Sequence, residues 1–337
     1  MNDLLVAGAG PAGLATAIHA ARAGLSVTVV DRRPGPIDKA CGEGLMPHTL
    51  RHLDALGITP HGKPFRGITY LDRNRRVEAR FPGAAGRGVR RTVLSEALHD
   101  TAATAGVRIV KGNIGDIEQD ANGVRCGGFA ARYLAAADGL HSPIRRQLGL
   151  DRPTNGPRRW GIRRHFQIAP WTDTVEVYWA EHTEAYVTPV ADDCVGVAIL
   201  TSRQGKFDDH LSEFPALAAR LAGAQGGPAR AAGPLRQRAS SQHHGRVMLV
   251  GDAAGYVDAL TGEGLGIALG CAELVVGAVL DDDPAGYTRQ WRRMSRRYRL
   301  LTSALLTASN SPARSMIVPA ATTLPRVFNQ AVKLLAQ

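Results

Sequence analysis

The chain has 337 residues, 44% of them hydrophobic and 21% charged, a composition that predicts a soluble enzyme with a sizeable core. The formal net charge is +11, but only five of the 41 basic residues are lysine. We interpret this excess as arginine-rich composition and as attraction for anionic cofactors. Nucleic-acid binding would rest on charge alone and is not predicted. The four cysteines form no C-x-x-C pair, which indicates free thiols and a cytoplasmic protein.

The first motif is LLVAGAGPAGLATAIHAARAGLSVTVVD at residues 4–31. It reads as an apolar strand, a glycine turn, a helix, a second strand and an acid, which is the dinucleotide-binding fingerprint in its proper context. Gly8 makes the tight turn, Gly10 lets the backbone approach a pyrophosphate, and Gly13 lets the helix pack close to the sheet. The helix N-terminus favours the negative pyrophosphate, and Asp31 would bind the adenosine ribose.

Helical and strand-like segments then alternate along the chain. We expect a helix near 47–56, strands at 66–71 and 76–81, a helix over 90–106, and strands near 107–110, 113–118 and 129–137. Residues 158–201 alternate apolar and polar residues, which is typical of an antiparallel sheet with one solvent-facing side. An α/β nucleotide-binding fold is therefore predicted to be interrupted by an antiparallel sheet.

A second glycine-rich motif, RVMLVGDAAGYVDALTGEGLGIAL, follows at residues 246–269. An apolar strand leads into Gly251 and Asp252, and Gly-Glu-Gly precedes an apolar helix. We expect this late motif to close the nucleotide site that the first motif opens.

Taken together, the motifs resemble the FAD-dependent oxidoreductases of the aromatic-hydroxylase (group A flavin monooxygenase) superfamily. The resemblance rests on the two glycine motifs and on Asp138-Gly139 followed by Ser142 and Arg145. Within that superfamily the chain looks like the geranylgeranyl reductase branch, on the strength of CGEGL at 41–45, Arg91 followed by Leu94 and Leu98, and the late motif. The resemblance implies a glutathione-reductase-like Rossmann FAD domain, interrupted by an antiparallel-sheet substrate domain and followed by C-terminal helices.

The domain boundaries follow from the same reading. The FAD-binding domain is expected at 1–62, 88–157 and 240–282, the substrate domain at 63–87 and 158–239, and a C-terminal helical region at 283–337.

FAD is the predicted cofactor. The resemblance implies that it is lined by Ala12, Asp31, Cys41, Gly42, Gly44, Arg91, Asp252, Gly264 and Leu265. The full set of candidate cofactor-binding residues adds Gly8, Gly10, Gly13, Arg32, Asp138, Gly139, Gly251 and Gly262.

Several of these residues have a physical role with a simpler alternative. Asp252 would accept hydrogen bonds from the ribityl hydroxyls, or act as a helix N-cap. Gly262 and Gly264 permit close backbone approach, and the helix that follows would stabilise the anionic reduced flavin with its positive end. Glu263 is either a first-turn capping acid or a catalytic group. Asp138 ends a strand near the pyrophosphate, or forms a simple turn.

No second dinucleotide fingerprint occurs in the sequence, so an NAD(P)H donor would dock transiently beside the flavin. Candidate arginines for its phosphates are Arg32, Arg33, Arg90 and Arg145, although the simpler interpretation of each one is an arginine that faces FAD or solvent. His243-His244 has no third ligand at metal-binding spacing, so no metal site is predicted.

The substrate end is less regular. The family's pocket segment is expected to contain Tyr, an aromatic residue and Pro, and the segment AYVTPVADDCVGVAIL keeps Tyr186 and Pro189 but lacks the usual tryptophan and phenylalanine. Tyr178 is a third candidate substrate residue. Aromatic side chains that would either line an apolar pocket or pack within the sheet are Trp160, Trp171, Tyr178 and Trp179.

Two activities remain open at this stage. The first is hydride transfer from flavin N5 to a C=C bond of a hydrophobic, isoprenoid- or polyketide-like substrate. The second is hydroxylation of an aromatic or polyketide-like substrate with O2. Cys41, the candidate catalytic residue, would be a reactive acid, a flavin-packing group or an inert thiol.

The last predicted element is a helix over 287–306. Trp291, Met294, Tyr298, Leu301 and Leu305 recur at steps of three and four and form one apolar stripe. Arginines flank the stripe, which predicts peripheral contact with an anionic membrane at the inner face. The alternative is that the stripe packs on the FAD domain and the arginines are solvated. The sequence does not predict an oligomeric state.

Overall fold

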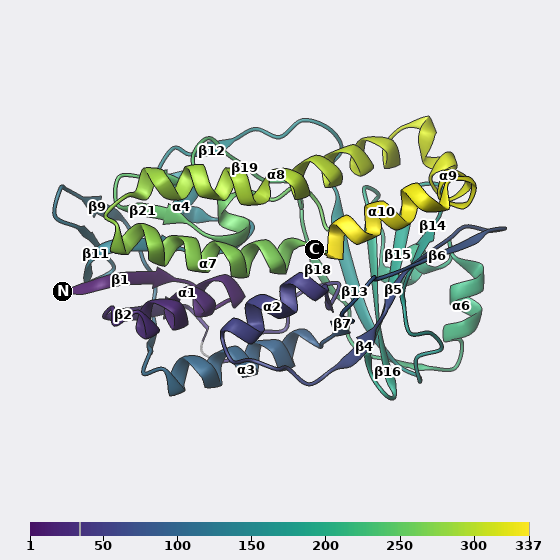
Figure 1. Cartoon of the computed structure of the whole chain (residues 1–337), viewed down its shortest axis with the longest axis horizontal. Helices are drawn as coiled ribbons and strands as arrows, with labels where there is room; N and C mark the ends of the chain where they lie inside the picture. The colour runs from purple at the N-terminus through teal and green to yellow at the C-terminus, as the bar shows by residue number, and fades with distance from the viewer. Residues whose placement is uncertain (34, 337) are drawn as a thin grey trace.

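Two large sheets lie side by side in the computed structural model, which describes residues 1–33 and 35–336. In Figure 1 the N-terminal unit occupies one half, the strands of the second sheet occupy the other, and the long helix α8 (Pro284–Ser309) runs from the first half to the second. The predicted fold class is confirmed: an α/β FAD-type unit, an antiparallel sheet and C-terminal helices.

The first sheet carries the nucleotide-binding motifs. Its strands, in spatial order, are β20 (His243–His244), β21 (Val247–Leu249), β11 (Phe129–Ala136), β1 (Asn2–Ala7), β2 (Val27–Asp31) and β8 (Arg108–Lys111), with β10 (Val124–Cys126) paired to β11 and β9 (Ile117–Gln119) paired to β10. The strands from β21 to β8 are parallel. Leu4, Leu5 and Val6 are fully buried, as expected for a parallel strand covered on both faces.

Helices cover this sheet. They are α1 (Pro11–Arg22), α3 (Arg91–Thr104), α4 (Pro143–Gln147) and α7 (Gly264–Leu280). Helix α1 packs against α3 and α7, and α7 packs against α8. The late motif therefore returns to the first motif, as the sequence predicted. One predicted strand is shorter than expected: residues 113–118 contribute only the start of β9, because Gly115 adopts φ 64°, which interrupts an extended chain.

The second sheet is antiparallel except where β14 pairs with β5. Its strands are β17 (Gln225–Gly226), β13 (Trp160–Gln167), β16 (Cys194–Thr201), β15 (Thr183–Ala191), β14 (Val175–Trp179), β5 (Gly67–Leu71) and β6 (Arg76–Arg80), with β18 (Arg230–Ala232) paired to β13. Alternate residues of β15 and β16, such as Val187 and Val197, pack on Leu217 of α6 (Pro215–Leu221) beside α5 (Phe207–Leu211). The residues between them face the first sheet.

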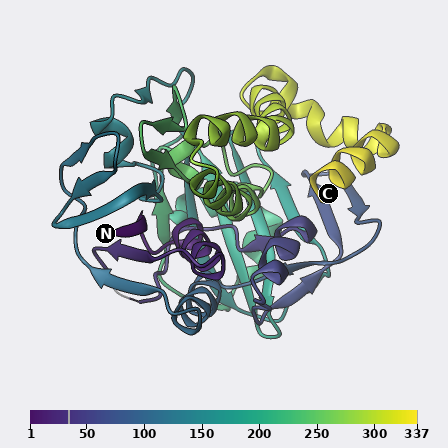
Figure 2. The ribbon, with the colours of Figure 1, turned by 60° about the vertical axis from the view of Figure 1, so that its left-hand side comes forward.

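Small elements connect the two sheets. They are β3 (Gly44–Leu45), α2 (Pro47–Ala55), β4 (Lys63–Phe65), β7 (Gly86–Gly88), β12 (Asp151–Arg152), β19 (Arg238–Ala239) and the 3-10 turn η1 (Gly251–Ala254). The C-terminal elements are η2 (Pro312–Met316), α9 (Ile317–Thr323) and α10 (Pro325–Ala336). Figure 2 shows these last helices beside the edge of the second sheet, where they contact β5 and β6.

The apolar stripe of α8 faces protein. Trp291 is 1% exposed and Tyr298 is 8% exposed, and Met294 packs on the core of the first unit. The Tyr298 hydroxyl donates to the Asp258 carbonyl at 3.0 Å. This is the packed arrangement that was the alternative to membrane insertion of the stripe. Among the described residues, no helix is both long enough and apolar enough to cross a bilayer.

Candidate functional site: a dinucleotide cavity between the sheets

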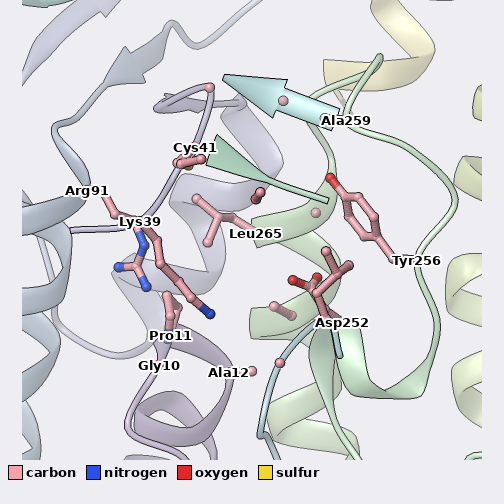
Figure 3. A pocket seen from close by; sticks show the side chains of 18 of the residues that line it. Gly10, Pro11, Ala12, Lys39, Cys41, Arg91, Asp252, Tyr256, Ala259 and Leu265 are labelled. Carbon is pink, nitrogen blue, oxygen red and sulfur yellow. The ribbon is translucent and has the colours of Figure 1, made fainter. Parts of the chain in front are cut away.

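A cavity of about 480 Å³ lies at the carboxyl ends of β1, β2 and β11 and extends to the second sheet. In open parallel sheets this edge is where ligands bind. Figure 3 shows Lys39 and Arg91 on one side of the cavity and Asp252 and Tyr256 on the other. Segments distant in sequence therefore enclose a single site.

The glycines of the first turn meet two different requirements, close packing within the protein and open space towards the cavity. Gly8 has φ 108°, and a Cβ on Gly13 would lie 1.9 Å from the Gly8 carbonyl oxygen, so both glycines are needed by the protein itself. A Cβ on Gly10, by contrast, would meet no protein atom within 4 Å and would project into the cavity. Helix α1 starts directly after Gly10 with no side-chain cap, so its N–H groups remain available for an anion.

Asp31 ends β2 beside this turn. Its Oδ2 accepts from the Ala9 N–H at 2.7 Å and its Oδ1 accepts from the Arg33 N–H at 2.8 Å. These bonds hold the glycine turn against β2, while the carboxylate still lines the cavity. Because a carboxylate has about four acceptor sites, ribose hydroxyls can bind in addition.

Buried polar groups without protein partners mark the middle of the site. Arg91 is 6% exposed. Within the described chain, neither Arg91 Nη1 nor Asp138 Oδ1 has a hydrogen-bond partner. Burial raises the pKa of Asp252, although Lys39, Arg91 and Arg145 oppose that rise. Unpartnered buried groups are costly, so these atoms fit a polar ligand such as the phosphates and ribityl chain of FAD.

The late motif approaches from the other side. Gly262 has φ 71°, and a Cβ there would meet nothing within 4 Å. Helix α7 begins at Gly264 and points its N-terminus at the cavity wall. Glu263 is the N-cap residue of α7, but its side chain makes no capping bond and instead pairs with His48 Nε2 at 2.7 Å. Of the two roles considered for Glu263, that of a capping acid is therefore excluded.

The structure brings most of the predicted cofactor residues together. Those that line the cavity are Gly8, Gly10, Ala12, Asp31, Arg32, Cys41, Gly42, Gly44, Arg91, Asp138, Gly139, Asp252, Gly262, Gly264 and Leu265. Gly13 and Gly251 lie behind the wall, where a Cβ would meet Gly8 and Ala12 respectively. Arg145 also lies outside the wall: it is fully buried, and its Nη1 donates to the Ala253 carbonyl at 3.1 Å.

The predicted substrate residues separate according to strand alternation. Tyr186 faces the cavity and donates to the Leu260 carbonyl at 3.1 Å. Pro189 is an odd number of positions from Tyr186 on β15, so the two residues face opposite sides, and Pro189 lies outside the cavity wall. Tyr178 packs towards α6 with Phe214 instead. The tryptophans at 160, 171 and 179 lie outside this cavity wall as well.

Some lining residues were not predicted. Tyr256 and Glu43 belong to motif segments and Lys39 lies just before one, but their side chains gave no separate signal. The apolar residues that the second sheet and the C-terminus contribute are Ile68, Tyr70, Val175, Val177, Leu200, Leu235 and Leu335. Their strand alternation was visible in the sequence, but not which face would meet the cofactor.

Cys41 lies in the cavity wall and is partly exposed, whereas the other three cysteines are buried. Desolvation raises the pKa of the Cys41 thiol, and the Glu43 carboxylate raises it further, against the opposing effects of Arg91 and Arg163. The thiol therefore keeps its proton at neutral pH and can act as an acid.

A family model described as an FAD binding domain matches residues 1–272. The menaquinone reductase of Mycolicibacterium smegmatis is 30% identical over 329 residues, which cover 86% of this chain and 79% of that protein. Digeranylgeranylglycerophospholipid reductase 1 of Methanothermobacter thermautotrophicus is 30% identical over 299 residues, which cover 78% of this chain and 73% of that protein.

A solved structure has the same fold. The crystal structure of a flavoprotein/dehydrogenase from Cytophaga hutchinsonii superposes with a TM-score of 0.84, at 19% identity, over 99% of this chain and 92% of that one. At this identity the likeness establishes the fold alone.

Proposed function

Because this chain belongs to the FAD binding domain family and is an FAD-dependent oxidoreductase, we propose that it reduces a C=C bond in the isoprenoid part of a hydrophobic substrate. The observation that carries the proposal is the cavity itself. Its dinucleotide-binding end continues directly into an apolar wall on the second sheet, formed in part by Ile68, Val175, Val177 and Leu200. An extended hydrocarbon chain fits such a wall.

The similar reductases support the same chemistry, since their names place menaquinone and a digeranylgeranyl lipid among the substrates of this branch. Both substrates carry isoprenoid chains with C=C bonds. The apolar face of the cavity also compensates for the missing tryptophan and phenylalanine of the family's pocket segment, because aliphatic side chains from β5, β14 and β16 supply the surface instead.

The reduction needs a hydride for one carbon of the double bond and a proton for the other. FAD, when bound and reduced by NAD(P)H or another two-electron donor, would supply the hydride. Gly10 and the N-terminus of α1 would hold its pyrophosphate, and Asp252 would hold its ribityl chain. The Cys41 S–H bond breaks to give the proton, and the thiolate regains a proton from water.

The test is anaerobic turnover. The FAD-loaded enzyme is reduced with dithionite, mixed with menaquinone without oxygen, and the product is analysed by mass spectrometry. We expect a side chain with two more hydrogens, and none in a control without FAD. A product that forms only with oxygen and gains an oxygen atom would instead assign the enzyme to hydroxylation. Dithionite makes the result independent of the natural donor, which we propose docks transiently.

Replacement of Cys41 tests its role as the acid. We expect Cys41→Ser to retain FAD and to lose roughly 100-fold in turnover, because general acid catalysis typically contributes that much. The measurement is the single-turnover rate of side-chain reduction together with the flavin absorbance. The matched control is Cys126→Ser on β10, away from the cavity, which should turn over normally. Unchanged turnover in Cys41→Ser would show that Cys41 is not the acid and only packs against the flavin.

Contact with an anionic membrane is the remaining part of the proposal. Arg292, Arg293 and Arg296 project from the solvent side of α8. Since the apolar stripe is packed inside, we expect binding by charge alone: sedimentation with anionic liposomes at low salt, loss of binding at high salt, and weaker binding when the three arginines become Gln. Neutral liposomes are the control. A folded protein that stays in the supernatant at low salt contradicts this membrane contact.

A further inference from the structure

A second pocket lies behind the late motif. It is lined by residues 236–239, by the loop that contains η1, and by one face of α8, and Figure 1 shows α8 beside β19 of the first segment. Asp252, Tyr256 and Gly264 line both this pocket and the cofactor cavity, so the late motif separates the two spaces. The volume of the second pocket is about 70 Å³. Because one water molecule needs about 10–15 Å³ of such space, the pocket has room for roughly five atoms, as many as a phosphate group contains.

Three arginines give this pocket a positive charge, and we call it the arginine pocket. Arg236 and Arg238 belong to the β19 segment and Arg299 belongs to α8. Within residues 1–33 and 35–336, none of the three forms an ion pair with a carboxylate. Desolvation lowers the pKa of Arg299. Nearby positive charges, on Arg238 first and then on Arg292 and Arg236, lower that pKa further. Like charges held this close repel one another, so an anion between them would be stabilised.

The guanidiniums are held in position but keep donors for a ligand. Arg236 Nη1 donates to the Asn155 carbonyl at 3.4 Å, and the Arg299 guanidinium lies 5.2 Å from the ring centroid of Trp291. A guanidinium carries five N–H donors, so these contacts leave most of them unused. Packing of this kind reduces the entropy that an arginine loses when it binds a ligand.

A buried hydroxyl indicates the same kind of ligand. Ser295 of α8 lines the arginine pocket and is fully buried, and its Oγ has no hydrogen-bond partner in the described part of the chain. Buried hydroxyls are normally hydrogen-bonded, because an unpaired one costs free energy. A phosphate oxygen would supply the missing acceptor. Asp252 carries the one carboxylate among the described wall residues, and Figure 3 shows its side chain in the cofactor cavity.

We propose that the arginine pocket binds a phosphate group through Arg236, Arg238 and Arg299 and through the Ser295 hydroxyl. Guanidiniums suit this ligand because their N–H groups form paired, charge-assisted hydrogen bonds with phosphate oxygens. The phosphate belongs to a soluble compound or to a lipid headgroup, since both present the same oxyanion. This site is separate from that of FAD and does not depend on the reaction proposed above.

The test is a calorimetric titration of the FAD-loaded protein with sodium phosphate, with sodium chloride keeping the ionic strength constant. We expect the wild type to bind one phosphate per chain. Arg238→Gln and Arg299→Gln should each weaken binding roughly tenfold, because each removes charge-assisted hydrogen bonds. Ser295→Ala keeps the net charge and should weaken binding roughly fivefold. The matched control is Arg73→Gln in the exposed turn between β5 and β6, which removes the same charge outside the pocket and should bind as the wild type does.

Vesicles distinguish the two sources of the phosphate. Wild type and Ser295→Ala are sedimented with phosphatidylcholine vesicles that contain phosphatidylglycerol. Weaker sedimentation of Ser295→Ala assigns the pocket to a lipid headgroup, because its net charge is unchanged, and equal sedimentation assigns it to a soluble phosphate compound. The proposal is wrong if the wild type binds no phosphate in the titration, an outcome that needs no variant to fold. It is also wrong if Arg238→Gln, Arg299→Gln and Ser295→Ala all bind phosphate as the wild type does.

Discussion

Gly10→Val is expected to yield a folded protein that has lost its yellow colour. The reason is the contrast between neighbouring glycines in the first turn. A side chain at Gly10 meets no protein atom within 4 Å, so the apoprotein accommodates it. In the cofactor site that we propose, however, it would occupy the space where the pyrophosphate approaches the N-terminus of α1. Overpacking costs typically about 1–3 kcal/mol, and the lost anion contacts add to that, so we expect FAD affinity to fall by roughly 100-fold or more.

Two variants make this result specific. Gly13→Val would place Cβ 1.9 Å from the Gly8 carbonyl oxygen and should prevent folding altogether. Gly83→Val is the matched control, because Gly83 also has nothing within 4 Å but lies outside the cavity. It should fold and bind FAD. The measurements are circular dichroism for folding and flavin absorbance after gel filtration. Full absorbance in natively folded Gly10→Val would remove this turn from the cofactor site.

The first unit could be predicted because its signals are local. A buried strand, a glycine turn and a helix follow one another within residues 4–31, and the late motif repeats that logic at 246–269. The turn that each glycine permits involves residues only a few positions away in the sequence. Hydrophobic periodicity and turn chemistry therefore predict the strand–turn–helix geometry without knowledge of long-range contacts.

The substrate side could not be predicted in the same way, because a period of two identifies two faces without saying which one meets the ligand. Tyr186 and Tyr178 both looked suitable, and only the pairing of β14 and β15 shows that they point to opposite sides. Long-range pairs gave no signal at all. His165 and Glu43 are 122 positions apart in the sequence, and neither segment contains a pattern that predicts their contact.

The stripe on α8 illustrates a different ambiguity. Lipid and a protein core are equally apolar, so the spacing of Trp291, Met294 and Tyr298 predicts burial but not what buries them. Tertiary packing on α7 and on the late motif decided the outcome. Helices α9 and α10 follow α8 in the chain and contact β5 and β6. As a result, Leu335 lies in the cavity wall.

A buried ionic network fixes these C-terminal elements, and its centre is Glu184. This side chain on β15 is fully buried, and its two oxygens lie 2.6 Å from Arg159 Nη2 and 2.6 Å from Arg314 Nη1. Arg159 also donates to Ser309 Oγ at the end of α8. Arg314 belongs to η2 and donates to the Thr183 carbonyl at 2.6 Å. Arg159 also pairs with the buried Asp258 at 3.5 Å, so Glu184 bridges two guanidiniums that join the second sheet to the C-terminal helices and Asp258 supplies a second negative charge.

Glu184→Ala should therefore be strongly destabilising, because it leaves the nearly buried Arg314 guanidinium without its carboxylate and leaves Arg159 with the longer, 3.5 Å contact to Asp258. Removing one partner of a buried ion pair typically costs about 3–5 kcal/mol. We expect a loss of that size in the free energy of unfolding, measured by urea denaturation at saturating FAD so that cofactor binding is constant. Tryptophan fluorescence is a suitable probe, since the Arg314 guanidinium lies 5.3 Å from the Trp179 ring centroid.

Glu181→Ala is the control: its side chain is 86% exposed, so the change in the free energy of unfolding should stay within about 0.5 kcal/mol. A loss below about 1 kcal/mol in Glu184→Ala would mean that the arginines find other partners and that the C-terminal helices are held by apolar packing alone.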